Sequence, residues 1–340
     1  MTTNIIDLRS DTITLPSEEM KKAMMNAELG DDVLQEDPTV NALQQYAAEL
    51  FGMEAALFCS SGTQTNQIAI NVHTHPGDEV ICSDLAHIYI YEGGGIALNN
   101  GASVRLIKGD RGRFTAEDVL ANINIRNDVH LPLTTLVCIE DTMNKGGGAI
   151  WDIQEIKRLR EVCDQHGLAL HCDGARLFNA LEVSGVDPKE YGKHFHSISI
   201  CLSKGLGAPI GSLLLGSKDF IERARRRRKS LGGGMRQAGM LAAAGMYALT
   251  VERHRLNVDR ENAMRAEAAL QQWSKCAEVI PVETNIVIWK PVAMGSAAMV
   301  EWLNERGVRC FPFGPEYIRF VFHRDISEHH MQQLFQIVKD

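Results

Sequence analysis

One lysine stands where an α/β protein would form an active site. Lys204 follows the apolar run 197–201 and is followed at once by Gly205. Active sites of open α/β sheets gather where strands end, and a lysine amine placed there can form a Schiff base. A solvated loop lysine would give the same local pattern. Lys204 is therefore a candidate that needs support from other residues.

A carboxylate at the end of a second apolar run offers that support. Asp173 follows the run 168–172, and Arg176 lies three residues later. Pyridoxal 5′-phosphate (PLP), which is carried on a lysine, needs a carboxylate against its pyridine nitrogen. The planar fork of arginine suits a substrate carboxylate. Asp173 could also be a plain helix N-cap and Arg176 a surface residue.

A third segment could bind phosphate. Ser61, Gly62 and Thr63 directly follow the apolar run 55–59 and open a predicted helix. Backbone N–H groups at a helix start, together with hydroxyls, bind phosphate well. A capped helix without a ligand would look the same. The three segments together would supply the lysine, the carboxylate and the phosphate cradle of a PLP site.

Other catalytic motifs are absent from the sequence. There is no G-x-x-x-x-G-K-[ST], H-E-x-x-H or G-x-S-x-G, and the stretch 205–211 has one residue too many for G-x-G-x-x-G. Two close histidine pairs, His73 with His75 and His194 with His196, have no further cluster around them. We interpret these histidines as structural or surface residues and predict no metal site.

Apolar patterning predicts the elements that position these residues. Short apolar runs alternate with longer segments of helical spacing, such as 39–51 and 152–166. This alternation indicates an α/β fold with a large, mostly parallel seven-stranded sheet covered on both faces. The predicted strands are 55–59, 79–83, 103–107, 135–140, 168–172, 197–201 and 212–216.

The pattern changes after residue 216. The segment 235–249 is rich in small residues and predicts a closely packed helix, with another subunit as one possible neighbour, while 258–273 predicts a surface helix. Short strands and helices follow, at 284–289, 298–307, 318–322 and 327–339. We therefore expect three parts: an N-terminal segment (1–16) that packs on the small domain, a large domain (17–245) and a smaller α+β C-terminal domain (246–340).

The composition limits the partners and the cellular location that we expect for the protein. The 340 residues are 45% hydrophobic and carry a net charge of −8, which argues against nucleic acid or an anionic membrane as the main partner. The eight cysteines form no C-x-x-C pair and predict buried free thiols. The first residues are charged where a signal peptide would be apolar, and no run of 18 apolar residues occurs. We expect a cytoplasmic protein.

The motifs follow one another in a characteristic order. They are S-G-T at 61–63, H-I-Y at 87–89, D-G-A-R at 173–176, S-K-G at 203–205 and G-G-G-M-R-Q at 232–237. In this order the chain resembles, nearly end to end, the L-threonine aldolase family of the low-specificity type, which are fold-type I PLP-dependent enzymes. The resemblance implies a large PLP-binding domain and a smaller C-terminal domain.

The resemblance also implies roles for individual residues around the cofactor. Lys204 would carry PLP, Asp173 would pair with the pyridine nitrogen, and His87 would stack on the ring. The remaining cofactor contacts would come from Ser61, Gly62, Thr63, Arg176 and Ser203, and from Lys229 and Arg236 of a neighbouring subunit in a homodimer or homotetramer.

Further residues would contact the amino-acid substrate. Ser10, Arg176 and Arg319 would hold its carboxylate. His130 matches a histidine near the substrate hydroxyl, and Tyr91 would lie against the substrate. Catalysis would therefore rest on Lys204, His87, Asp173 and His130.

Three positions depart from the family pattern. The family usually has a tyrosine where this chain has Leu34, an asparagine at Asp141 and a histidine at Met143. The implied reaction is retro-aldol cleavage of L-threonine, L-allo-threonine or a related β-hydroxy-α-amino acid to glycine and an aldehyde. The alternatives are transamination or β-elimination by another PLP enzyme, and a PLP-binding protein without turnover.

Overall fold

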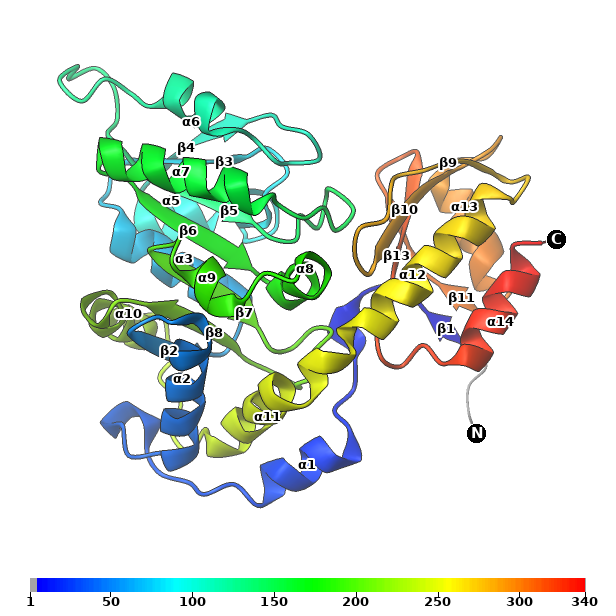
Figure 1. Ribbon diagram of the computed structural model, residues 1–340, viewed down its shortest axis with the longest axis horizontal. Coiled ribbons are helices and arrows are strands. Elements are labelled where there is room, and N and C mark those ends of the chain that lie inside the picture. Colours follow the sequence, from blue (N-terminus) through cyan, green and yellow to red (C-terminus); the bar gives the residue numbers. More distant parts are fainter. Residues whose placement is uncertain (1–4, 340) are drawn as a thin grey trace.

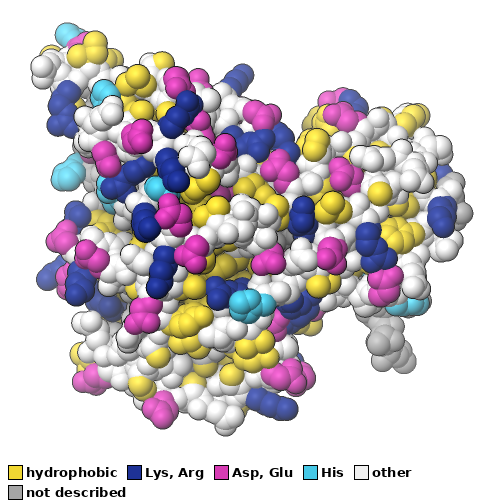
Figure 2. Space-filling model, viewed as in Figure 1, with side chains coloured by type: hydrophobic (Ala, Val, Ile, Leu, Met, Phe, Trp, Pro, Cys, Tyr) yellow, Lys and Arg dark blue, Asp and Glu magenta, His cyan; other side chains and the backbone are white. Residues whose placement is uncertain are grey.

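The chain folds into two lobes that lie side by side (Figure 1). The computed structural model describes residues 5–339. The large lobe is built on a seven-stranded sheet, and the small lobe on a four-stranded sheet with a two-stranded ribbon beside it. On the face shown in Figure 2, basic and acidic side chains are interspersed, as the near balance of charge in the sequence suggests.

The large sheet confirms the predicted fold class. Its strand order is β2-β8-β7-β6-β5-β3-β4, and β8 alone runs antiparallel to its neighbours. Strands β3, β7 and β8 are buried along their whole length, because helices cover both faces. The strands are β2 (Ala55–Cys59), β3 (Glu79–Ser83), β4 (Ser103–Ile107), β5 (Thr134–Glu140), β6 (Ala169–Gly174), β7 (Ser197–Cys201) and β8 (Ser212–Gly216).

Local signals fix where the helices of the large lobe begin and end. For example, Asp37 caps α2 through the N–H of Val40, Pro38 occupies its first turn, and Gly52 ends it in a left-handed conformation. The helices are α1 (Glu18–Met25), α2 (Pro38–Phe51), α3 (Gly62–His73), α4 (His87–Ile90), α5 (Gly95–Asn100), α6 (Ala116–Asn122), α7 (Ile153–His166), α8 (Leu177–Ser184), α9 (Pro188–Gly192), α10 (Lys218–Ser230) and α11 (Gly239–Thr250), with short 3-10 turns η1 (Asp11–Ile13), η2 (Asp32–Leu34) and η3 (Glu252–Arg255).

The small-residue helix α11 begins four residues later than predicted. The N–H of Gly239 donates to the carboxylate of Asp37 at 2.9 Å, and this contact fixes the first turn. A Cβ on Gly245 would lie 2.9 Å from Leu43, so the small residues let α11 approach α2 closely. The close packing predicted for this helix is therefore made with helices α1 and α2 of the same chain.

The small lobe has an antiparallel sheet of order β12-β13-β10-β9. Its core gathers around Trp289, Phe320 and Phe322, all fully buried. The N-terminal segment joins this lobe, because β1 pairs in parallel with β11. The elements are β1 (Ile6–Asp7), α12 (Leu256–Gln271), β9 (Cys276–Val279), β10 (Ile286–Pro291), α13 (Ser296–Asn304), β11 (Val308–Arg309), β12 (Phe311–Phe313), β13 (Tyr317–Val321) and α14 (Glu328–Ile337).

Helices α11 and α12 connect the lobes (Figure 1). Helix α12 was predicted to lie on the surface, but one of its sides is buried, including Ala263, Ala266 and Leu270. The predicted part boundaries at 16/17 and 245/246 stay predictions, and residues 1–4 and 340 of the predicted end segments lie outside the described residues. All eight cysteines are free, and seven of them are buried. Within residues 5–339, no helix has the length and apolar content that crossing a bilayer requires.

Candidate active site

A cavity of about 520 Å³ lies between the lobes, where the sheet of the large lobe faces β12 and β13 of the small lobe. It brings together six of the residues predicted from the sequence, which are Ser10, His87, Tyr91, Arg176, Lys204 and Arg319. The other lining residues are Thr12, Asn144, Phe311, Pro312 and Phe313. The N-terminal segment thus contributes to the site together with both lobes.

Lys204 enters the cavity from the turn that follows β7. The carbonyl of Lys204 accepts the N–H of Gly207 at 2.8 Å, and Gly207 has a φ of 75°, which closes the turn. Ser203 and Lys204 are both half-buried. The lysine is therefore held at a strand end with its amine facing the cavity, and not as a fully solvated loop residue.

Asp173 lies at the end of the neighbouring strand β6 and is almost completely buried. Its carboxylate accepts hydrogen bonds from the Asn66 side chain at 2.9 Å and from the Ala175 N–H at 3.3 Å. Arg176, and not Asp173, occupies the N-cap position of α8. Within residues 5–339, no Lys or Arg forms an ion pair with Asp173. A buried carboxylate without a cation is costly, and a protonated pyridine ring would supply the missing charge.

The first turn of α3 forms an anion cradle beside these residues. The Ser61 hydroxyl accepts the N–H of Gln64, and its carbonyl accepts that of Thr65. The N–H groups of Gly62 and Thr63 lie in the unbonded first turn of the helix. A Cβ on Gly62 would lie 2.6 Å from the sulfur of Cys201, so only glycine fits there. This cradle and the uncompensated carboxylate fit PLP.

Glu92 orients the imidazole of His87, a contact that sequence patterns did not reveal. His87 Nδ1 lies 3.0 Å from a Glu92 oxygen and donates to it. The Glu92 carboxylate also accepts from Asn66 at 2.8 Å and from Gln67 at 2.7 Å, and its side chain is fully buried. Asn66 therefore links Asp173 to Glu92, the partner of His87. In the neutral imidazole, Nε2 then carries the lone pair.

Two electrostatic effects act on the groups next to the ring site. Burial lowers the pKa of His87, but the hydrogen bond to Glu92 and the charges of Asp173 and Glu140 outweigh it, so the pKa is raised overall. Burial and the nearby Asp173 raise the pKa of Glu140. Glu140 accepts the backbone N–H groups of His87 and Asn144, both within 3 Å. It thereby ties the end of β5 to the two segments that flank the cavity.

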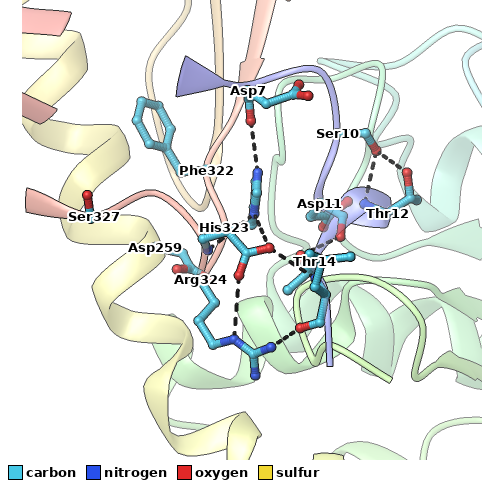
Figure 3. Close-up of polar contacts among 12 residues, drawn as sticks. Asp7, Ser10, Asp11, Thr12, Thr14, Asp259, Phe322, His323, Arg324 and Ser327 are labelled. Carbon is cyan, nitrogen blue, oxygen red and sulfur yellow. Dashed lines mark hydrogen bonds and ion pairs between the residues drawn. The ribbon is translucent and has the colours of Figure 1, made fainter. Parts of the chain in front are cut away.

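Arg176 is buried and pairs with Asp11 of the N-terminal segment. Its Nε and Nη2 atoms donate to the two Asp11 oxygens at 2.8 and 2.6 Å, so this edge of the fork is occupied. Burial raises the pKa of Asp11, but Arg176 outweighs it and holds that pKa below its usual range. Figure 3 shows Asp11 in the short turn in which Thr12 donates to the hydroxyl of Ser10. Arg176 is thus not a surface residue, and its predicted role on the substrate carboxylate stays a prediction.

Arg319 differs from Arg176 in its partners. Its Nη1 donates to the Asn144 side chain at 2.9 Å and its Nη2 to the Arg9 carbonyl at 3.3 Å, both neutral groups. Arg319 therefore faces the cavity without an ion pair or hydrogen bond to any carboxylate in residues 5–339. A substrate carboxylate would neutralise the guanidinium of Arg319.

Three of the predicted residues that do not line the cavity are exposed at the surface of this chain. The side chain of His130 is 87% exposed and contacts Asp128 on the connection between α6 and β5. Lys229 is exposed, and Arg236 pairs with Asp31 at the surface. The two latter residues are predicted to act on a neighbouring subunit, and the roles of all three residues stay predictions.

The three departures from the family pattern lie outside the cavity lining. Leu34 is exposed, whereas Met143 and Asp141 are buried beside the end of β5. Tyr191 donates its hydroxyl proton to Asp141 at 2.8 Å. Burial raises the pKa of Asp141 to about 7. This carboxyl group therefore titrates near neutral pH.

Comparisons with known proteins agree with this geometry. Residues 7–293 match the family model described as beta-eliminating lyase. A low-specificity L-threonine aldolase of Escherichia coli K12 is 42% identical over 330 residues, with 97% of each chain covered. A probable low-specificity L-threonine aldolase 2 of Arabidopsis thaliana is also 42% identical, over 96% of this chain and 94% of that one. The solved threonine aldolase of Leishmania major covers 98% of both chains with a TM-score of 0.85 at 21% identity, a likeness in fold.

The chain thus belongs to the family whose model is described as beta-eliminating lyase. More narrowly, the chain belongs to the low-specificity L-threonine aldolase family. The resemblance inferred from the order of the motifs is confirmed.

The contact between Glu92 and His87 generates a first prediction. Glu92→Gln keeps the shape of the side chain and removes its charge, so the pKa of His87 should fall. We expect an NMR titration of the His87 ring in the cofactor-free protein to show this decrease relative to the unchanged chain. The ring signal of His130, which is exposed on the connection between α6 and β5, serves as the internal reference in both proteins. An unchanged His87 pKa would show that Glu92 does not stabilise the charged imidazole.

The buried Asp141 generates a second prediction. In the unfolded chain it ionises near pH 4, but in the folded protein only near pH 7, so folded-state stability falls as pH rises between these values and is constant above. Asp141→Asn removes this penalty and keeps an oxygen for Tyr191. The variant should gain stability relative to the unchanged chain as pH rises from 4.5 to 7.5, by on the order of 2–4 kcal/mol. Urea unfolding at several pH values measures this gain, and a difference independent of pH would contradict it.

Proposed function

We propose that the protein is a PLP-dependent aldehyde-lyase that cleaves L-threonine, L-allo-threonine or related β-hydroxy-α-amino acids to glycine and an aldehyde. The observation that carries this proposal is the buried carboxylate of Asp173, which forms no ion pair with a Lys or Arg among the described residues, beside a cavity that holds Lys204, His87 and Arg319. The aldolases of E. coli and Arabidopsis, with which the chain aligns nearly end to end, support the choice of reaction.

The residues present would hold the cofactor at four points. Lys204 would bind it covalently, Asp173 would face its ring nitrogen, His87 would cover one face, and the cradle of Ser61, Gly62 and Thr63, with Ser203, would take the phosphate. When bound, PLP supplies an electron sink for the carbon whose bond to the side chain is broken. The protein contributes position and charge.

The substrate would be oriented by its carboxylate. Arg319 has an uncompensated guanidinium in the cavity, and the Ser10 hydroxyl lies in the same wall. Fixing the carboxylate turns the bond between Cα and Cβ so that it, and not another bond at Cα, is aligned for cleavage. Arg176 contributes through the atoms that Asp11 leaves free.

A base must remove the proton of the β-hydroxyl group. His87 donates from Nδ1 to Glu92, which leaves Nε2 to accept that proton, directly or through a water molecule. His130 is exposed in the single chain. In the proposal it approaches the hydroxyl only when the segment that carries it lies against a site, and it affects the accepted configuration at Cβ.

Release of an aldehyde tests the reaction. The purified protein should bind PLP, turn yellow, and release aldehyde from threonine, allo-threonine or phenylserine in a coupled assay. Formation of glutamate from 2-oxoglutarate without aldehyde would instead favour transamination. Binding of PLP with neither product would favour the binding protein without turnover.

The covalent attachment gives a third prediction. Borohydride reduction should fix PLP to the peptide that contains Lys204, as measured by mass spectrometry. Lys204→Ala should lose the label and turnover, because no other lysine lines the cavity among the described residues. Lys218→Ala, an exposed control on α10, should keep both. A label on a different lysine would refute the central assignment.

We infer further that the enzyme works in the cytoplasm as a homodimer or homotetramer with shared sites. The free thiols fit a reducing compartment. Lys229 is exposed and the side chain of Arg236 is 57% exposed beside its partner Asp31, so both side chains are accessible to a phosphate on a neighbouring chain.

Complementation gives a fourth prediction. Lys204→Ala and Arg236→Ala should each be inactive alone, but hybrid dimers of the two should regain one complete site and part of the activity. Mixed proteins carrying different affinity tags allow the hybrids to be purified and assayed. Inactive hybrids would show that Arg236 serves its own chain.

A further inference from the structure

Lys145 lies at the rim of the active-site cavity in a setting that the reaction proposed above does not use. Its Nζ atom is 5.8 Å from the ring centroid of Tyr91 and 5.6 Å from that of Phe313. Both rings line the cavity, one from each lobe. The lysine is half-buried and follows Asn144, whose N–H donates to Glu140 at 2.9 Å. Its ammonium group therefore lies at the edge of the cavity, near one aromatic ring from each lobe, and Lys145 is not itself a lining residue.

Within the described part of the chain, Lys145 has no carboxylate partner. Among residues 5–339 no carboxylate forms an ion pair or hydrogen bond with it, and its contacts are with the two aromatic rings. Arg319 shares this feature, because its hydrogen-bond partners are neutral, and its guanidinium lies 5.9 Å from the centroid of the same Phe313 ring. Two uncompensated cations thus lie against one ring of the cavity wall.

A third cation of this wall, Arg176, differs from Arg319 and Lys145 because it has a counter-charge. Arg176 is neutralised by the two oxygens of Asp11. A β-hydroxy-α-amino acid with a neutral side chain, such as threonine, has one carboxylate and can compensate one cation. The second uncompensated cation matches a second anionic group on the substrate.

We propose that the site takes β-hydroxy-α-amino acids whose side chain carries a carboxylate, of which 3-hydroxyaspartate is the smallest. Arg319 holds the α-carboxylate, and Lys145 holds the side-chain carboxylate at the rim. This inference rests on the proposed aldolase function and names a substrate class for it. Lys145 is then a specificity residue that touches the substrate and takes no part in bond cleavage.

The reaction balances without a further reactant. The bond between Cα and Cβ breaks, and its electron pair stays with Cα, which takes up one proton and becomes the methylene carbon of glycine. The β-hydroxyl group loses its proton, and its oxygen becomes the carbonyl oxygen of glyoxylate. No oxidant or reductant is needed.

The test compares charged and neutral substrates in the PLP-loaded enzyme. The kcat/KM values are measured for 3-hydroxyaspartate, for its neutral analogue 3-hydroxyasparagine and for threonine. Lys145→Met keeps the length of the side chain and removes the charge, whereas Lys145→Arg keeps the charge. Lys22→Met, an exposed lysine of α1, is the matched control.

We expect Lys145→Met to lower kcat/KM for 3-hydroxyaspartate by about tenfold or more, the size of one charge-assisted contact. The values for threonine and 3-hydroxyasparagine should change by less than about twofold, as expected when no charged contact is lost. Lys145→Arg should keep most of the activity on the charged substrate, and Lys22→Met should resemble the unchanged enzyme. Equal losses on all three substrates, or cleavage of threonine without cleavage of 3-hydroxyaspartate, would overturn the inference.

Binding of aspartate separates this inference from the proposed function. L-Aspartate has both carboxylates but no hydroxyl group, so it cannot undergo the aldol cleavage, and calorimetry can compare it with L-alanine. Preferred binding of aspartate that is lost in Lys145→Met supports the anion site even if no β-hydroxy amino acid is cleaved, in which case only the proposed function fails. Equal binding of both ligands in an enzyme that cleaves threonine refutes the anion site alone.

Discussion

The buried ion pair between Asp11 and Arg176 is the contact on which the assembly of the site depends. A guanidinium stays charged at any physiological pH, so in the interior it requires a carboxylate. Asp11 provides this carboxylate. It follows strand β1, which pairs with β11 of the small lobe. Asn285 of the small lobe lies next to the same carboxylate (3.5 Å). The pair therefore fixes the N-terminal segment between the lobes, and loss of one partner would cost about 3–5 kcal/mol.

The same rule of charge compensation distinguishes structural groups from ligand-binding groups. Arg176 and Asp11 satisfy one another, and Glu92 is satisfied by His87, Asn66 and Gln67. The charges of these groups are therefore matched within the protein. Asp173, Arg319 and Lys145 are different, because the described residues leave each of them with an unmatched charge. The signs of these charges predict a cationic ring nitrogen on one side and carboxylates on the other.

Sequence patterns predicted the strands of the large lobe well, because each is a short apolar run between helices. Strands β2, β3, β4, β7 and β8 have the predicted bounds, and β5 and β6 differ at their ends by one or two residues. The edge strands β9 and β12 were missed. They are largely exposed and lack alternation, and β12 contains Pro312, which only an edge position tolerates.

The site was predictable only where chemistry is encoded locally. Lys204 and Asp173 stand out because each directly follows an apolar strand. Asn66 and Glu92 carry no such signal, since Asn66 meets its partners 26 and 107 residues away in the chain. Asp11 lies 165 residues from Arg176 and could be paired with it only once the topology was known. Long-range partners of this kind are set by packing.

The segment after β5 shows why departures from a family pattern need a structure for their interpretation. Met143 is fully buried, pairs through its backbone with Ala149, and packs against Gly112, so it does not line the cavity. Asp141 likewise points to Tyr191 beneath the site. The two departures from the family pattern, Met143 and Asp141, therefore change residues that pack behind the cavity and not residues that line it. The next two residues, Asn144 and Lys145, are the ones that reach Arg319 and the aromatic walls. In this segment, the side chains that contact the cavity lining are thus those of Asn144 and Lys145, and not those of the two departing positions.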